Sequence, residues 1–308
     1  MDPEISKDEL KAYKAAKAQL TDENKASFGK WLKTKGWRHL IGWVMIFYAI
    51  FPLAYVLSGS FADATQFTSS FFSSFTTDNY TALFEDPFRP YGNWFVNTLF
   101  ISGTAAIGSV FLSALAAYAF SRLRFTGRRA GLLTLILVQM FPQLLALVAI
   151  YALLVELGNI FPFLGIGSQI ALILVYLGGA LGANTYLMYG FFNTIPKELD
   201  EAAKIDGATH TQIFYGMILR LAAPILAVIG LLSFIGTSSD FILANIILTK
   251  PETKTLAVGL YMYVSDQFGQ NWTVFAAGAV LAAVPIVALF LYLQKYIVSG
   301  LTGGAVKG

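Results

Sequence analysis

Six long apolar stretches constrain the fold of this chain more than any other feature. Each has about 20 or more residues, dominated by Leu, Ile, Val, Ala and Phe, which is the length a helix needs to cross the hydrocarbon core of a bilayer. They run over Trp37–Ser58, Trp94–Phe120, Gly131–Leu154, Ile170–Phe192, Leu221–Leu248 and Trp272–Tyr296. We therefore predict an all-α integral membrane protein with six transmembrane helices, in which residues 37–298 form the membrane domain.

The amino-acid composition supports a membrane protein and argues against several other kinds of protein and site. Only 13% of the residues are charged and the mean hydropathy is +0.63, whereas a soluble domain carries about 25% charged residues. The net charge of +3 gives no indication of nucleic-acid binding. The chain has no cysteine, which excludes disulfides and thiolate metal sites. His39 and His210 are far apart and form no HExxH-type pair, so we expect no metal site.

The distribution of Lys and Arg predicts the orientation. Eighteen of the 21 fall in the first 38 residues, the 121–130 loop, the 193–220 stretch and the C-terminus. The exceptions are Arg89, Lys250 and Lys254. Because short cytoplasmic loops carry the excess of Lys and Arg, both termini and the 193–220 loop are expected in the cytoplasm.

Residues 1–36 precede the first apolar stretch as a basic extension. Lys7, Lys11, Lys14 and Lys17 recur at helical spacing, which favours a solvated helix or a helix on the lipid surface. A dedicated docking role is the alternative. The charged region is too long and too mixed in sign for a signal peptide.

The 193–220 loop is the one long polar insert in the second half of the chain. Pro196 can begin a helix, because its missing N–H is not needed in the first turn. Helix-forming residues follow over Lys197–Ile205, and Gly207 permits the positive φ of a chain reversal. Thr209 and Gln212 have the spacing of a capping box for a second helix. The pattern predicts a compact helix–turn–helix on the cytoplasmic surface.

Several side chains of this loop suit contact with another protein. Ala202, Ala203 and Ala208 are small enough for a partner to approach closely. Glu201 and Asp206 can meet basic groups of that partner. Composition alone leaves open an ordinary cytoplasmic loop with caps and a turn.

The residues Glu201-Ala202-Ala203, followed by Asp206-Gly207-Ala208 and Pro224, resemble the EAA loop of ABC-importer permeases. The resemblance implies the type I ABC importer permease fold, with this loop between helices 4 and 5 and docked on a separate ATPase subunit. The positions it assigns to ATPase coupling are Glu201, Ala202, Ala203, Asp206, Gly207, Ala208 and Phe214. Relatives often have proline where this chain has Arg220, which affects only where the fifth helix begins.

Three further stretches are similar to the smaller permease subunit of maltose/maltodextrin importers: residues 139–142, 252–260 and 298–308. That resemblance implies import of maltose/maltodextrin-type oligosaccharides across a bacterial or archaeal cytoplasmic membrane. The implied partners are membrane lipid, a larger homologous permease, a dimeric ABC ATPase and an external sugar-binding protein. An external loop at about Lys250–Asn271 would approach the binding protein. A cytoplasmic tail, residues 299–308, would lie between the ATPase subunits and contact them through Thr302, Gly304 and Lys307.

The energy for import must come from elsewhere, because the chain has no G-x-x-x-x-G-K-[ST] phosphate loop. We expect no catalytic residue and no cofactor in this chain, with ATP and Mg held by the partner ATPase. Alternating access would follow from rocking of two halves around a central site.

Polar residues inside a span are costly and tend to face a cavity. Gln139, Asn184 and Asp240 are therefore the candidates for the translocation path. An aspartate at a helix centre costs about 2.5–3.5 kcal/mol on insertion scales. Asp240, however, follows Gly236-Thr237-Ser238-Ser239, so a helix break wetted by external water is the alternative reading.

Two other functions remain possible from the sequence. A stand-alone secondary transporter or channel would need charged residues mid-membrane for ion coupling, and these are nearly absent. A membrane-embedded enzyme would have to use Ser, Asp or Glu. Neither accounts for the 193–220 loop, and association with an ATPase would separate them from a permease.

Overall fold

The computed structural model describes residues 11–14, 35–67, 71–72, 74–265 and 270–305. These residues contain helices and connecting turns, and no strand occurs among them. The chain divides into two compact units, residues 1–56 and 57–308. The all-α prediction is therefore confirmed for the described part of the chain.

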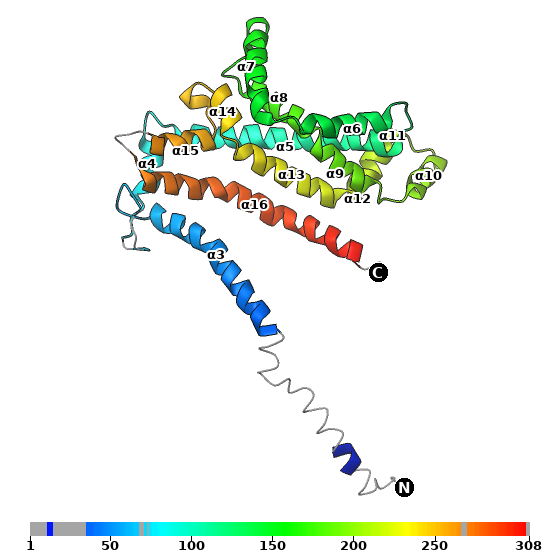
Figure 1. Cartoon of the computed structure of the whole chain (residues 1–308), viewed down its shortest axis with the longest axis horizontal. Helices are drawn as coiled ribbons and strands as arrows, with labels where there is room; N and C mark the ends of the chain where they lie inside the picture. The colour runs from blue at the N-terminus through cyan, green and yellow to red at the C-terminus, as the bar shows by residue number, and fades with distance from the viewer. Residues whose placement is uncertain (1–10, 15–34, 68–70, 73, 266–269, 306–308) are drawn as a thin grey trace. The chain divides into compact units, whose positions relative to one another are not determined.

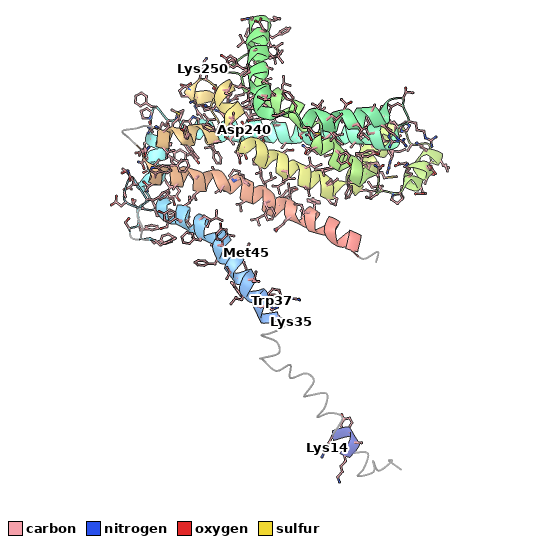
Figure 2. All side chains as sticks on the ribbon, viewed as in Figure 1. Lys14, Lys35, Trp37, Met45, Asp240 and Lys250 are labelled. Atoms are coloured by element: carbon pink, nitrogen blue, oxygen red, sulfur yellow. The ribbon has the colours of Figure 1, made fainter. Side chains whose placement is uncertain are left out.

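The first unit contains most of α3 (Trp37–Ser60). This helix matches the first predicted span and is long and apolar enough to cross a membrane. Large apolar side chains are exposed all around it, and Trp37 and Met45 mark its course in Figure 2. A helix that is apolar on every side is suited to lipid. Of the predicted basic extension, residues 11–14 form a helical turn, and residues 1–10 and 15–34 lie outside the described residues.

The second unit is built around α5 (Figure 1). Small side chains such as Ala105, Ser109 and Ala117 recur on its buried face, and small residues allow helix backbones to approach closely. Helices α8, α9, α13 and α15 pack against it, and α16 packs against α13. The helices of this unit are α4 (Asp78–Glu85), α5 (Tyr91–Arg122), α6 (Arg128–Gln139), α7 (Gln143–Ile160), α8 (Gln169–Ala180), α9 (Ala183–Phe192), α10 (Lys197–Ile205), α11 (His210–Ile213), α12 (Leu219–Leu221), α13 (Ala223–Ser238), α14 (Ile242–Ile247), α15 (Leu256–Ser265) and α16 (Trp272–Ala305), with short 3-10 turns at Pro162–Leu164 and Pro251–Thr253 and a π-helical turn at Phe214–Ile218.

Three apolar clusters follow one another along α5. Near its start, Tyr91 and Trp94 pack with residues of α4, α15 and α16. Further along, Ile101 packs with residues of α7, α8 and α14. Near its end, Tyr118 packs with α9, the π-helical turn and α13. One long helix therefore contributes to all three clusters of the second unit.

The predicted spans are more broken than the sequence suggested. The third predicted segment, Gly131–Leu154, is divided between α6 and α7 at Pro142, which has no N–H to continue a helix. The two helices take different directions in Figure 1. The fourth bends by 49° between α8 and α9. The fifth, Leu221–Leu248, ends as α13 at Ser238 and α14 is a separate helix. In the described residues three helices can span a membrane, or up to five if each bent pair is one span.

The segment predicted as an external loop, Lys250–Asn271, is largely helical. It contains α15, whose buried residues join the cluster around Trp94. The Trp94 indole donates to the Pro251 carbonyl at 2.7 Å, and Asn97 donates to the carbonyls of Glu252 and Lys254. A side chain at Gly259 would overlap the Trp94 ring, so this close approach requires glycine. The preceding stretch, about 59–93, contains the small helix α4.

Candidate functional site

The 193–220 loop forms two helices joined by a tight reversal. Helix α10 ends at Ile205, and Gly207 has a φ of +84°. The Gly207 N–H donates to the Lys204 carbonyl at 3.0 Å and the Ala208 N–H to the Ala203 carbonyl at 2.9 Å. This pair of bonds is a Schellman motif, in which a left-handed residue closes the end of a helix. The predicted positive φ at Gly207 is confirmed.

A capping box begins the second helix of the loop. The Gln212 N–H donates to Thr209 Oγ1 at 3.3 Å, and the Thr209 N–H donates to Gln212 Oε1 at 2.8 Å. The helix continues through the π-helical turn into α12. The capping box predicted from the sequence is therefore confirmed, and the loop has a defined shape at both ends of its turn.

The coupling candidates divide into an exposed and an inward-facing group. Glu201, Ala202, Asp206 and Gly207 are exposed, and Ala203 and Ala208 are half-buried. Phe214 is buried, with its ring centroid 5.0 Å from that of Tyr118. Phe214 thus holds the loop on its own chain, and any effect it has on docking acts through the position of the loop.

A buried ion pair attaches the loop to α5. Arg122 Nε lies 2.5 Å from Asp200 Oδ2, and the two side chains are 4% and 7% exposed. Arg122 Nη2 also donates to the Ile195 carbonyl at 3.0 Å. One turn earlier, the Tyr118 hydroxyl donates to the His210 carbonyl at 3.3 Å. No local pattern in the sequence indicates this pair, because Arg122 and Asp200 lie on two helices that are far apart along the chain.

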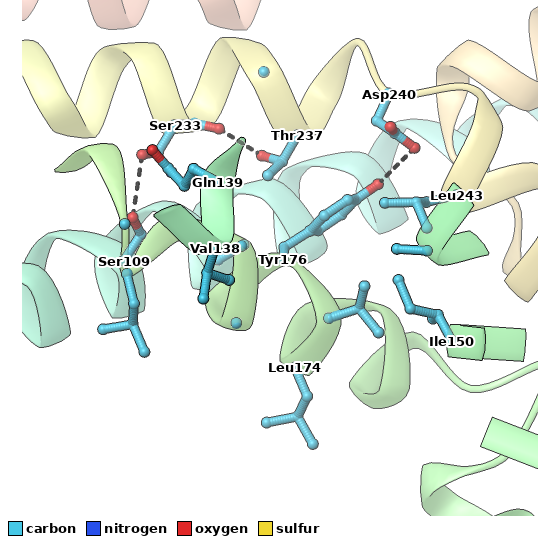
Figure 3. Close-up of a pocket in the computed structure, with 18 of the residues that line it drawn as sticks. Ser109, Val138, Gln139, Ile150, Leu174, Tyr176, Ser233, Thr237, Asp240 and Leu243 are labelled. Atoms are coloured by element: carbon cyan, nitrogen blue, oxygen red, sulfur yellow. Dashed lines mark hydrogen bonds between the residues drawn. The ribbon is translucent and has the colours of Figure 1, made fainter. Parts of the chain in front are cut away.

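The three translocation candidates line one cavity. Gln139, Asn184 and Asp240 all lie on the wall of a cavity of about 1460 Å³ between α5, α6, α7, α8, α9 and α13 (Figure 3). Most of the other lining residues are apolar. Gln139 packs directly against Gly182 at the bend between α8 and α9, where a larger residue would overlap it. The interruption after α6 and this bend therefore meet at the cavity.

Two hydrogen-bonded groups supply the polar part of the wall. Asn184 Nδ2 donates to Ser109 Oγ at 2.9 Å and to Ser233 Oγ at 3.2 Å, joining α9 to α5 and α13. Tyr176 donates its hydroxyl to Asp240 Oδ1 at 3.2 Å, as the dashed line in Figure 3 marks. These groups leave spare acceptor atoms on Asn184 and Asp240.

Asp240 also lies at the helix break that the alternative interpretation predicted, between α13 and α14. Its Oδ1 accepts the N–H of Ala244, in the first turn of α14, at 3.1 Å. Asp240 precedes α14 and Lys250 follows it, as labelled in Figure 2. The helix break and the place on the cavity wall are thus both properties of this residue.

Comparison with known families identifies the kind of protein that has this architecture. Residues 94–303 match the family described as the binding-protein-dependent transport system inner membrane component. The chain belongs to this family. It is a permease of an ABC importer, a non-catalytic membrane subunit whose energy comes from a separate ATPase. The resemblance seen in the 193–220 loop is confirmed at the level of the family.

Curated relatives cover nearly the whole permease. The chain is 43% identical over 262 residues to the galactooligosaccharides transport system permease protein GanQ of Bacillus subtilis, covering 84% of this chain and 90% of that protein. It is 40% identical over 293 residues to the maltose/maltodextrin transport system permease protein MalG of Vibrio vulnificus, covering 91% and 98%.

A solved structure has the same fold. A chain of a bacterial ABC transporter involved in the import of the acidic polysaccharide alginate superposes with a TM-score of 0.72 at 23% identity, covering 84% of this chain and 94% of that one. A second structure, of an alginate ABC transporter in complex with an alginate pentasaccharide-bound periplasmic protein, matches with a TM-score of 0.54 at 17% identity, covering 92% of this chain and 95% of that one. The permease therefore has the ABC importer permease fold that the sequence predicted, and the number of spans stays a prediction.

Proposed function

We propose that this permease forms half of the translocation pathway for maltose/maltodextrin-type oligosaccharides. The permeases it resembles are named as transport-system permeases for maltodextrin, maltose/maltodextrin and galactooligosaccharides. A largely apolar cavity with two placed polar groups is the kind of wall that suits a sugar, which offers apolar ring faces and hydroxyl groups. A larger homologous permease would supply the other half.

The 193–220 loop couples this pathway to the ATPase in our proposal. The observation that carries it is the rigid attachment of a small, polar helix–turn–helix to α5, through the buried pair of Arg122 and Asp200. Glu201 and Ala202 are exposed on that element, where a dimeric ABC ATPase holding ATP and Mg can contact them. In this proposal the loop and both termini lie in the cytoplasm, where ATP is available, and the sugar-binding protein acts on the other side of the membrane.

The C-terminal tail is the second proposed ATPase contact. Residues 299–305 continue α16 as helix, and this stretch includes Thr302 and Gly304. Lys307 lies outside the described residues. Deleting residues 302–308 should lower coupled ATP hydrolysis and leave membrane insertion unchanged.

Reconstitution in proteoliposomes tests the proposal as a whole. The permease, its larger partner, the ATPase and the cognate external receptor would be combined, and maltodextrin uptake measured with and without ATP. Glu201→Ala should reduce both ATPase retention and uptake. Removing one partner of a buried interfacial charge pair costs about 2–5 kcal/mol.

Glu198→Ala is the matched control, because it removes another exposed carboxylate of α10. Equal retention for both variants would show that Glu201 is only a solvated helix residue. Uptake that persists without ATP or ATPase would refute the proposal in favour of a secondary transporter or channel. ATP-dependent uptake of a different oligosaccharide would refute only the proposed substrate.

A further inference from the structure

Four arginines lie close together around the connection between α5 and α6, and the structure divides them into two kinds. Arg122 is buried and paired with Asp200. Arg124 and Arg129 are exposed and Arg128 is half-buried. Within the described ranges, no carboxylate lies at ion-pair distance from these three. Three positive charges are thus left without a counter-charge from the part of the chain that the structure describes.

The three unpaired arginines surround a hollow. Arg124, Phe125, Gly127, Arg128, Arg129 and Ala130 line a depression of about 390 Å³. It is large enough for a small charged group and open to the outside. Phe125, which is 46% exposed, adds an apolar edge. The hollow therefore combines cationic groups with a hydrophobic side chain.

Packing holds two of these side chains, Phe125 and Arg128, in place. The Phe125 ring lies 5.7 Å from that of Phe120, in the last turn of α5. A side chain at Gly131, in the first turn of α6, would press against the same Phe120 ring, because its Cβ would lie 3.1 Å from it. The Arg128 guanidinium lies 5.9 Å from the ring centroid of Tyr189 on α9. A ligand bound here would meet Phe125 and Arg128 already held by packing, which lowers the cost of binding.

The charges are placed where they repel one another. Arg128 and Arg129 occupy the first two positions of α6, and the first turn of that helix contains no acidic residue. The start of a helix carries a partial positive charge, so cations there are unfavourable and anions are stabilised. An anion in the hollow would offset this repulsion.

We propose that the hollow of Arg124, Arg128 and Arg129 binds the phosphate-bearing headgroup of an acidic phospholipid. The hollow directly follows α5, one of the helices able to span a membrane, so it lies within reach of lipid headgroups. Clusters of Arg beside a membrane helix attract anionic lipids. The exposed Phe125 favours a lipid over a free anion, because its ring can contact the acyl region. Arginine matches phosphate with paired N–H donors.

A binding assay on the full-length permease in detergent tests this site without any transport step. The probe is a fluorescent phosphatidylglycerol, with phosphatidylcholine as the neutral lipid. Each arginine near an anionic lipid contributes about a fivefold factor in affinity, the equivalent of about 1 kcal/mol. Arg124→Gln combined with Arg129→Gln should therefore weaken phosphatidylglycerol binding about 25-fold and leave phosphatidylcholine binding unchanged. Circular dichroism would confirm that the variant is folded.

Lys250→Gln combined with Lys254→Gln is the matched control, since it also removes two positive charges, near the other end of α5. Equal weakening in both double variants would show non-specific attraction and overturn the proposal, as would unchanged binding in the arginine variant. Displacement of the lipid by millimolar inorganic phosphate would assign the hollow to a free anion. Loss of ATPase co-purification with unchanged lipid binding would assign it to a protein partner.

Discussion

The buried pair of Arg122 and Asp200 gives the sharpest test of how the 193–220 loop is held. Arg122→Gln leaves the Asp200 carboxylate buried without its partner, and Asp200→Asn leaves the arginine in the same state. Because the two side chains are only 4% and 7% exposed, solvent screens the pair little. Removing one partner of a buried pair costs about 3–5 kcal/mol. We expect each single variant to lose stability in this range.

Replacing both partners separates the interaction energy of the pair from the cost of leaving one charge buried alone. Arg122→Met combined with Asp200→Leu removes both charges and keeps apolar volume, and such double replacements are often neutral. The double variant should therefore be closer to the unsubstituted permease than either single variant, with a coupling energy above about 1 kcal/mol. Arg220→Gln, at an exposed arginine, is the control and should change stability by less than about 0.5 kcal/mol.

The measurement is the free energy of unfolding of the full chain in mixed detergent micelles, titrated with SDS and followed by circular dichroism. ATPase retention is measured in parallel. Additive effects of the two single substitutions would show that the side chains do not interact. Single variants as stable as the Arg220→Gln control would refute the reasoning that burial makes this pair essential to the loop.

Three further predictions concern the turn, the cap and the cavity. Gly207→Val should weaken ATPase retention and cost about 1–3 kcal/mol, because a β-branched residue is strained at a φ of +84°. A side chain at this position has open space, so a steric clash would not explain the loss. Gly207→Asn should be tolerated better, and equal retention by both variants would contradict the strain argument. Thr209→Ala should lower the free energy of unfolding by about 1 kcal/mol through loss of the capping box, and an unchanged SDS midpoint would show that the cap is dispensable. Asn184→Leu removes the bonds to Ser109 and Ser233, each worth about 0.6 kcal/mol in a membrane protein, and should lower sugar uptake with ATPase retention unchanged; normal uptake would remove Asn184 from the pathway.

Residues that are close together in the sequence made some turns, caps and helices of this protein predictable. The reversal at Gly207 and the capping box of Thr209 and Gln212 depend on residues within a few positions of one another, and both occur as expected. The apolar stretches around α3, α5 and α16 are long and continuous, so they were recognised from length and composition. A helix break before Asp240 was only an alternative from the sequence, on Gly236-Thr237-Ser238-Ser239, and α13 does end at Ser238.

Contacts between distant segments were decided only by the tertiary structure. Gln139, Asn184 and Asp240 were chosen singly for their polarity, and the packing of several helices brought them to one cavity. Arg122 and Arg124 both belong to a loop that the sequence predicts to be cytoplasmic, yet one is buried against Asp200 and the other is exposed beside a hollow. Sequence spacing determines which groups share a turn of helix. Which charged side chains form an ion pair across the fold depends on how whole helices pack, and no local sequence pattern indicates these pairs.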